Sequence, residues 1–164
     1  MAETAQATHL TQNPFDSWKS IVISLYMTLV GYGVLVGIPV ISTAWVTLLG
    51  FSEVEVGRVA GADLGGLSVG AVITAALIAK TSRRMLALIG LFIAVIANWF
   101  CLSIVDYETV LWLRALSGVG SGIFTAVAVS SLGASSKPAL AYNAMLFAFA
   151  FSQALEMHFL PLLS

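Results

Sequence analysis

The sequence is short of charged side chains. Its 164 residues include 7 Lys or Arg and 8 Asp or Glu, so only 9% of the chain is charged. A typical soluble domain has about 25%. Hydrophobic residues make up 59%, and the mean hydropathy is +0.98. A water-soluble fold of this size cannot hide so much apolar surface, which excludes a soluble enzyme and a disordered tail. The net charge of −1 offers no basic surface to nucleic acid. The composition therefore predicts a membrane protein that is solvated by the lipid bilayer.

Cysteine is nearly absent as well. Cys101 is the single cysteine, which excludes an internal disulfide and a multi-cysteine metal site. The sequence also has no phosphate-binding loop. We expect no cofactor and no metal, and we expect Cys101 to behave as a buried apolar residue rather than as a reactive thiol.

Long uncharged stretches divide the chain into membrane spans. No residue from Ser20 to Ser52 is charged, and about 20 apolar residues suffice to cross a bilayer. Residues 1–19 are a polar segment that precedes the spans. Residues 20–164 predict an all-α, polytopic transmembrane bundle with helices near Ile21–Leu48, Val56–Ala79, Met85–Ile104, Val110–Leu132 and Ala139–Leu163. The third helix has bulky apolar residues on all sides, so we expect it to be the most exposed to lipid.

The charged loops predict an orientation, because Lys and Arg accumulate on the cytoplasmic side of a membrane. One end of the bundle carries the basic residues Lys19, Lys80, Arg83, Arg84 and Lys137. The other end carries the acidic residues Glu53, Glu55, Asp106 and Glu108, with Arg58 as its only base. We therefore expect a multi-pass protein of the cytoplasmic (inner or plasma) membrane with its N-terminus inside.

Glycines mark two predicted contact faces. Glycines four residues apart strip one helix face of side chains and let a second backbone approach closely. The second helix has the pairs Gly61/Gly65 and Gly66/Gly70, and the fourth has Gly118 and Gly122. We expect these residues to pack helices against each other or against a second chain.

The segment Gly66-Leu67-Ser68-Val69-Gly70 matches the nucleophile elbow of serine hydrolases in its letters. That elbow needs a turn from a strand into a helix, whereas Ser68 lies in a continuous predicted helix. The candidate base His158 would also lie about 10 Å from Ser68 along the membrane normal, beyond hydrogen-bond reach. We therefore expect no enzyme.

Three charged residues fall inside predicted spans. Each of Asp63, Arg114 and Glu156 costs roughly 2.5–3.5 kcal/mol at the bilayer centre, so such residues pair with one another or line a cavity. Helix lengths put all three at similar depth in the outer half. We expect Arg114 to pair with Asp63 or with Glu156, and the unpaired acid to bind a proton; the other reading is a salt bridge that only fixes helix register.

Two motifs resemble those of the major facilitator superfamily. The stretch Arg114-Ala115-Leu116-Ser117-Gly118-Val119-Gly120 is similar to the superfamily's fourth-helix pattern Arg-x-x-Gln-Gly-x-Gly, with Ser117 in place of glutamine. The turn Leu77-Ile78-Ala79-Lys80-Thr81-Ser82-Arg83-Arg84 is similar to its signature Gly-x-Leu-Ala-Asp-Arg-x-Gly-Arg-Arg. In that turn Ala79 replaces the signature aspartate.

The resemblance implies a secondary transporter that moves a small solute by alternating access, together with H⁺ or Na⁺. It implies that the first and fourth helices line a central cavity, which makes Arg114, Tyr26, Tyr32, Ser42 and Thr43 candidates to face the solute. It also implies that Lys80, Arg83 and Arg84 form a cytoplasmic gating turn. The antiporter motif of the family's fifth helix is not evident, which favours symport or uniport.

Superfamily members have about twelve helices in two halves, and this chain supplies about five. We therefore expect the N-terminal portion of a truncated or longer carrier that needs its second half, or another membrane chain, to transport. The alternative is a membrane fragment or helical partner subunit that carries no solute.

Overall fold

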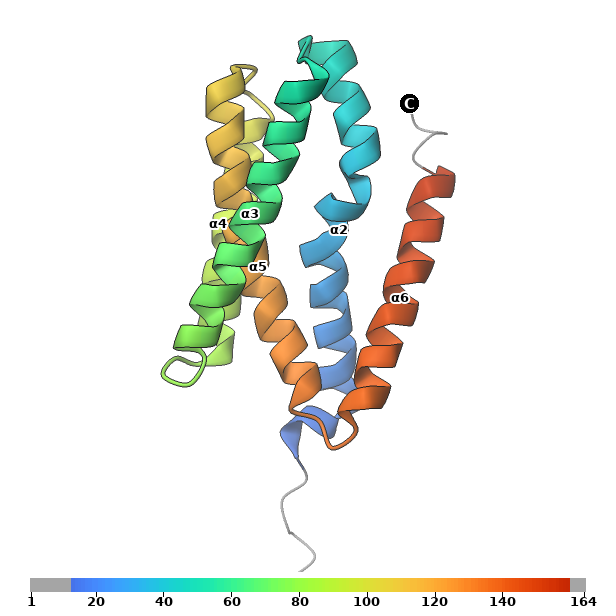
Figure 1. The fold of residues 1–164 in the computed structure, drawn as a ribbon. Coiled ribbons are helices and arrows are strands. Elements are labelled where there is room, and N and C mark those ends of the chain that lie inside the picture. Colours follow the sequence, from blue (N-terminus) through green and yellow to red (C-terminus); the bar gives the residue numbers. More distant parts are fainter. Residues whose placement is uncertain (1–12, 160–164) are drawn as a thin grey trace, which may run out of the picture.

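The chain forms an all-helical bundle with no strand among the described residues. The computed structural model describes residues 13–159, without the side chains of residues 34–36, 39, 40 and 157. A short 3-10 turn precedes five long helices, which run alternately up and down (Figure 1). The elements are η2 (Pro14–Asp16), α2 (Trp18–Leu49), α3 (Glu53–Leu77), α4 (Arg83–Cys101), α5 (Tyr107–Gly133) and α6 (Pro138–Phe159). Each predicted span is therefore a helix; the expected end of the last one, at Leu163, lies outside the described residues.

The helices begin slightly earlier than their apolar stretches. α2 begins at Trp18 rather than Ile21, and α3 at Glu53 rather than Val56. The reason is N-capping: the side chains of Ser17, Ser52, Ser82 and Asp106 each accept a hydrogen bond from a first-turn amide of α2, α3, α4 and α5 in turn. A cap satisfies backbone donors that the first turn leaves free, so polar residues extend each helix beyond its apolar stretch.

The outer faces of the helices are apolar. Within residues 13–159, four helices (α3 to α6) are long and apolar enough to cross a membrane. On α4, exposed large side chains recur every three or four residues, at Met85, Leu88, Phe92, Val95 and Trp99. On α6 they recur every four, at Phe147, Phe151, Leu155 and Phe159. Such stripes suit a lipid surface, and the chain is a multi-pass membrane protein.

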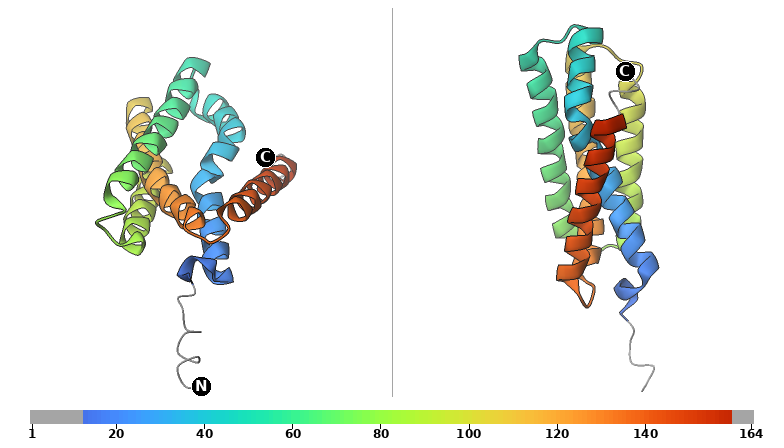
Figure 2. Two further views of the ribbon diagram at one scale, coloured as in Figure 1. Left: turned by 60° about the horizontal axis from the view of Figure 1, so that its bottom comes forward. Right: turned by 90° about the vertical axis from the view of Figure 1, so that its right-hand side faces the viewer.

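Helix α5 is the centre of the bundle. It packs most extensively against α3 and α4 and also contacts α2 and α6 (Figure 2). In its most apolar window 56% of the residues are buried, against 17% in α4 and 6% in α6. The expectation that the third span (α4) is the most exposed is therefore wrong, because α4 packs along α5 whereas α6 contacts the bundle only through α2 and one end of α5.

Glycines bring α5 into backbone contact with its neighbours. A Cβ added at Gly66 or Gly70 would overlap backbone atoms of Ala115 or Val119, and one at Gly118 or Gly122 would overlap α3. Gly90 of α4 and Gly120 of α5 meet in the same way, a contact that the sequence analysis missed. By contrast, a Cβ at Gly61 or Gly65 would meet no described atom within 4 Å, so within residues 13–159 these two glycines make none of the expected close contacts.

The two kinds of glycine predict opposite responses to alanine. Gly66→Ala forces α3 away from α5 and should lower the free energy of unfolding by about 1–3 kcal/mol, the usual cost of overpacking. Gly61→Ala is the matched control and should be neutral or stabilise by about 0.5–1 kcal/mol, because alanine favours the helix. Thermal unfolding of the purified protein in detergent measures both. Equal midpoints for the two variants would contradict the close contact of α3 and α5.

Candidate functional site

Arg114 and Asp63 form a buried ion pair between α5 and α3. Arg114 Nη2 lies 3.0 Å from Asp63 Oδ2, and the two side chains are 6% and 12% exposed. Within residues 13–159 it is the only salt bridge. Of the two partners left open for Arg114, the structure therefore brings Asp63 to it.

Asn98 of α4 completes a network across three helices. Arg114 Nη1 donates to Asn98 Oδ1 at 2.7 Å, and Asn98 Nδ2 donates to Ser117 Oγ at 2.7 Å and to the carbonyl of Ala94 at 2.8 Å. Ser117 is fully buried, at 0% exposure. Buried polar groups must be hydrogen-bonded, and this amide serves as acceptor for the guanidinium and donor to α5 at once.

The backbone contacts described above fix the position of the pair. Gly118 follows Arg114 by one helical turn, so both lie on the same face of α5. A Cβ at Gly118 would overlap the carbonyl of Asp63 itself. The absence of a side chain at Gly118 thus lets the α3 backbone come close enough for the Asp63 carboxylate to reach Arg114.

Glu156 does not join this network. Its Oε1 accepts a hydrogen bond from Ser152 Oγ at 3.1 Å, one turn earlier on α6. Among the described helices α6 packs mainly against α2 and α5. The sequence indicated a similar depth for all three charges. In the structure only Arg114 and Asp63 of the three meet, and Glu156 is half-buried on the most exposed helix.

The polar candidates on α2 are dispersed. Tyr26 is 67% exposed, whereas Tyr32 packs edge-on against Phe149 of α6, with ring centroids 5.7 Å apart. Ser42 and Thr43 line a small cavity beside Glu53 at the far end of α2. None of these four side chains lines the cavity beside Arg114.

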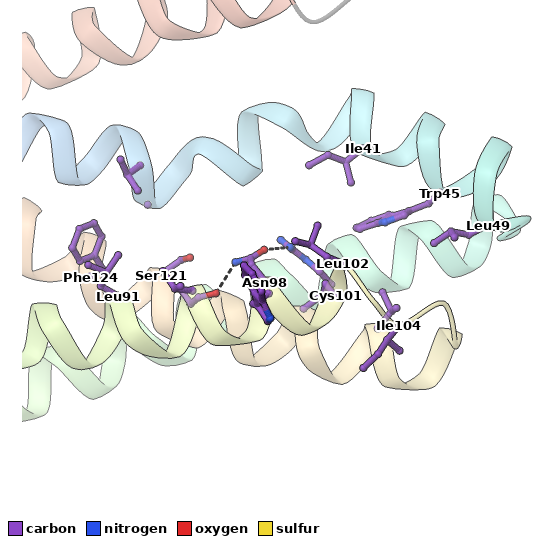
Figure 3. Close-up of a pocket in the computed structure, with 17 residues that line it drawn as sticks. Ile41, Trp45, Leu49, Leu91, Asn98, Cys101, Leu102, Ile104, Ser121 and Phe124 are labelled. Atoms are coloured by element: carbon purple, nitrogen blue, oxygen red, sulfur yellow. Dashed lines mark hydrogen bonds between the residues drawn. The ribbon is translucent and has the colours of Figure 1, made fainter. Parts of the chain in front are cut away.

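A cavity of about 490 Å³ lies between α2, α4 and α5, and Arg114 forms part of its wall. In Figure 3, Ile41 and Trp45 of α2 lie opposite Asn98 of α4 and Leu102, the residue that follows α4. The other polar lining residues include Ser121 of α5 and Cys101. Cys101 is only partly buried, so the expectation that it behaves as a buried residue is wrong: it lies at the last residue of α4, where the helix borders the cavity.

The basic turn between α3 and α4 is tied to the N-terminal end of the chain. Arg83 Nη1 donates to Ser131 Oγ at 3.1 Å, and its guanidinium lies 4.5 Å from the ring centre of Phe15. Lys80 and Arg84 are exposed. Of the three residues assigned to a gating turn, Arg83 is thus the one that bonds to α5.

A second set of hydrogen bonds closes the same end of the bundle. Asp16 accepts hydrogen bonds from the backbone amide and the hydroxyl of Ser136, and Asn13 Nδ2 donates to the carbonyl of Ala134 at 2.7 Å. The Ser136 hydroxyl and amide lower the pKa of the exposed Asp16 carboxyl below its ordinary value. At the opposite end, the Thr109 hydroxyl and amide lower the pKa of the Asp106 carboxyl, which caps α5. The contacts of Asn13 and Asp16 thus join the segment around η2 to the loop between α5 and α6.

Other chemistry finds no support in the geometry. Ser68 lies within α3 and its hydroxyl donates to the carbonyl of Leu64 at 3.1 Å, as in an ordinary helix. Residues 13–159 contain no group of three or more His, Cys, Asp or Glu side chains that could hold a metal ion.

Sequence reasoning missed Asn98 and its partner Ser117. Asn98 is uncharged, so a search for charges within the spans does not find it, although it is the one amide side chain in the third span. An asparagine within an apolar span carries an insertion cost of its own and therefore signals a partner.

One comparison with known proteins gives a match. The family model described as "Sugar (and other) transporter" matches residues 5–153, which is most of the chain. That family is a transporter family of the major facilitator superfamily, and it is not a family of enzymes. No curated protein and no solved structure matches the chain significantly.

The ion pair predicts strong coupling between its two residues. Asp63→Asn leaves the Arg114 charge buried without its counter-charge and should lower the free energy of unfolding by about 3–5 kcal/mol. The double variant Asp63→Asn/Arg114→Gln removes both charges and should recover most of that loss. Glu108→Gln, at the exposed start of α5, is the control and should change stability by less than about 0.5 kcal/mol. Additive effects in this cycle, measured by thermal unfolding in detergent, would show that the pair contributes no coupling.

Proposed function

This chain belongs to the Sugar (and other) transporter family, and on that premise we propose that it is the N-terminal bundle of a secondary transporter that moves a small solute by alternating access. The transport is driven by a gradient of H⁺ or Na⁺ and requires the second half of the carrier or another membrane chain. The observation that carries the proposal is the buried Arg114–Asp63–Asn98 network beside a cavity. Intramembrane charges in such a place mark a solute or ion pathway.

The packing divides the bundle into a closely packed unit and two more loosely attached helices. Helices α3, α4 and α5 meet through backbone contacts at glycines, which makes them one unit. Helix α2 meets this unit across the cavity, and α6 meets mainly α2. In alternating access the rigid unit would rock against the second half of the carrier, while α2 and α5 face the solute.

We assign proton coupling to Glu156. The Asp63 carboxylate is matched by the Arg114 guanidinium, so a proton there would leave an unpaired buried cation. Within residues 13–159, Glu156 has the Ser152 hydroxyl as its partner and forms no salt bridge, so its protonation would leave no described counter-charge unpaired. Of the two acids, Glu156 is therefore the one that the structure leaves without a counter-charge, and we assign the coupled proton to it.

We place the protein in the cytoplasmic membrane with its N-terminus inside. One end of the bundle, at the bottom of Figure 1, carries the basic segments: the start of α2 with Lys19, the turn of residues 80–84, and the loop with Lys137. The acidic loops lie at the opposite end, which supports the orientation that the positive-inside rule predicts. At the inner end, Lys80, Arg83 and Arg84 are assigned to control of inward opening, with Arg83 bonded to α5.

Solute uptake by the complete carrier in proteoliposomes tests the proposal. Glu156→Gln should lose at least about tenfold of proton-driven uptake while retaining exchange of solute without a gradient, since only coupling is removed. Glu108→Gln is the control and should keep full driven uptake. Full proton-driven uptake by Glu156→Gln would exclude the assignment. No solute flux in any form would favour the partner-subunit alternative.

Sidedness of labelling tests the orientation. In a Cys101→Ala background, Lys80→Cys and Glu108→Cys place single thiols at opposite ends of the bundle. An impermeant maleimide applied to whole cells should label Glu108→Cys only, and Lys80→Cys should react after the membrane is opened. Labelling of both from the same side would contradict the five-helix arrangement itself.

A further inference from the structure

A second cavity lies at the basic end of the bundle, the lower end in Figure 1, where α2 and α4 begin and α5 ends. It has a volume of about 620 Å³. Its basic lining residues are Lys19 of α2 and Arg83 and Arg84 of α4. None of its lining residues is acidic, and none of the three cations takes part in the one salt bridge within residues 13–159. The cavity therefore carries positive charge that no carboxylate of the described chain balances.

The acid nearest to this cavity along the chain is engaged elsewhere. Asp16 accepts hydrogen bonds from the amide and the hydroxyl of Ser136, in the loop between α5 and α6, and both residues border a different cavity. Arg83 is held in place by Ser131 Oγ and by the ring of Phe15. A guanidinium has five N–H donors, and only Nη1 of Arg83 donates to the described chain. Arg83 therefore keeps donors for a ligand.

The other two cations are accessible to a ligand. Lys19 and Arg84 are exposed, and each also lines the cavity. Each is the second residue of its helix, after the capping residues Ser17 and Ser82, which line the cavity as well. The first turn of a helix leaves backbone amides without an intrahelical partner and attracts anions. Two helix N-termini and three cations thus border one cavity, an arrangement that suits a phosphate group.

The interior of the cavity adds a hydroxyl that the described chain leaves unpaired. Ser24 of α2 lines the cavity and is 5% exposed, and its hydroxyl forms no hydrogen bond among the described residues. The fully buried side-chain atoms without a partner in that part of the chain are Arg114 Nε and Thr125 Oγ1, so the Ser24 hydroxyl keeps some accessible surface. A buried hydroxyl normally has a partner, and this one can donate to a phosphate oxygen in the cavity.

Apolar side chains around the polar residues favour a lipid over a soluble phosphate. Met27 and Val127 line the interior of the cavity. Ile23 also lines it and is 58% exposed, and Met85 lies exposed beside it in the first turn of α4. Trp18 is exposed at the start of α2, as is typical of a membrane interface. Basic pockets between transmembrane helices are typical sites for the headgroups of anionic lipids.

We propose that this cavity binds an anionic phospholipid of the cytoplasmic leaflet, with the phosphate held by Lys19, Arg83 and Arg84 and the acyl chains along Ile23 and Met85. The leaflet follows from the orientation proposed above, whereas the site does not depend on the transport function. A zwitterionic lipid would bring its own cation to a cavity that already has three. A soluble phosphate would leave the apolar lining in contact with water. An anionic phospholipid matches both the charge and the apolar surface.

Competition in mixed micelles tests the site. The complete carrier in detergent is allowed to bind a phosphatidylglycerol that has a fluorescent acyl chain. The competitors are unlabelled phosphatidylglycerol, phosphatidylcholine with the same chains, and inorganic phosphate. Phosphatidylglycerol should displace the probe, and phosphatidylcholine should do so at least about tenfold more weakly because its headgroup has no net charge. Inorganic phosphate at the same concentration should not displace it.

Matched changes of charge locate the binding. Lys19→Gln/Arg84→Gln removes two charges of the cavity and should weaken the binding of phosphatidylglycerol roughly 25-fold, about fivefold for each charge. Lys80→Gln/Lys137→Gln removes two exposed charges from the same end of the bundle outside the cavity, and should weaken it less than about twofold. Ser24→Ala keeps every charge and should weaken it at least about threefold, because one hydrogen bond to the phosphate is lost.

Four results would overturn the inference. Equal losses in the two double variants would show attraction by the net charge of the surface rather than a site. Equal competition by phosphatidylcholine would exclude an anionic headgroup, and displacement by inorganic phosphate would assign the cavity to a soluble anion. Absence of any binding of phosphatidylglycerol would exclude the lipid outright. The assay measures no flux, so none of these results bears on the proposed transport.

Discussion

The burial of one arginine in an almost uncharged bundle constrains the rest of this structure. A guanidinium among apolar helices is tolerable only with a counter-charge and hydrogen-bond partners, and Arg114 finds them on two neighbouring helices, as Asp63 on α3 and Asn98 on α4. Both partners can reach it only if α3 and α4 lie close to α5. Glycines on the facing sides of α3, α4 and α5 permit that approach, so the polar network depends on the close helix contacts that these glycines allow.

Much of this arrangement could be predicted from the sequence, and what could not has definite physical reasons. Apolar length and the loop charges predict the five spans, because lipid imposes its thickness on every helix. The depth of Arg114 and the two acids limits its partners to Asp63 and Glu156, but depth does not say which helices touch. The choice depends on the tertiary contact at Gly118. For the same reason, equal spacing could not separate Gly66 and Gly70, which meet α5, from Gly61 and Gly65, which meet no helix among residues 13–159.

The bundle is tight on one side and loose on the other. The contacts of α5 with α3 and α4 involve backbone atoms at glycines, and Thr74 Oγ1 adds a hydrogen bond of 3.4 Å to the carbonyl of Ile123. The contact of α2 with α6 instead uses side chains, such as the rings of Tyr32 and Phe149. Side chains can change rotamers without moving a helix, whereas backbone contacts cannot adjust without separating the helices. A conformational change is therefore easier at α2 and α6 than within the unit formed by α3, α4 and α5.

The same asymmetry explains why a cavity and an unused donor occur where they do. The pairing of Arg114 with Asp63 draws the guanidinium toward α3, and Asn98 holds its other edge toward α4. With Nη1 and Nη2 engaged in these directions, Nε is left without a protein partner, and no polar side chain of α2 reaches it. The planar guanidinium reaches Asp63 on α3 and Asn98 on α4 through two separate nitrogens in a fixed fork, which a compact ammonium group does not offer. The contacts that make the Arg114 charge tolerable in the bundle are thus also the ones that leave Nε buried without a hydrogen-bond partner.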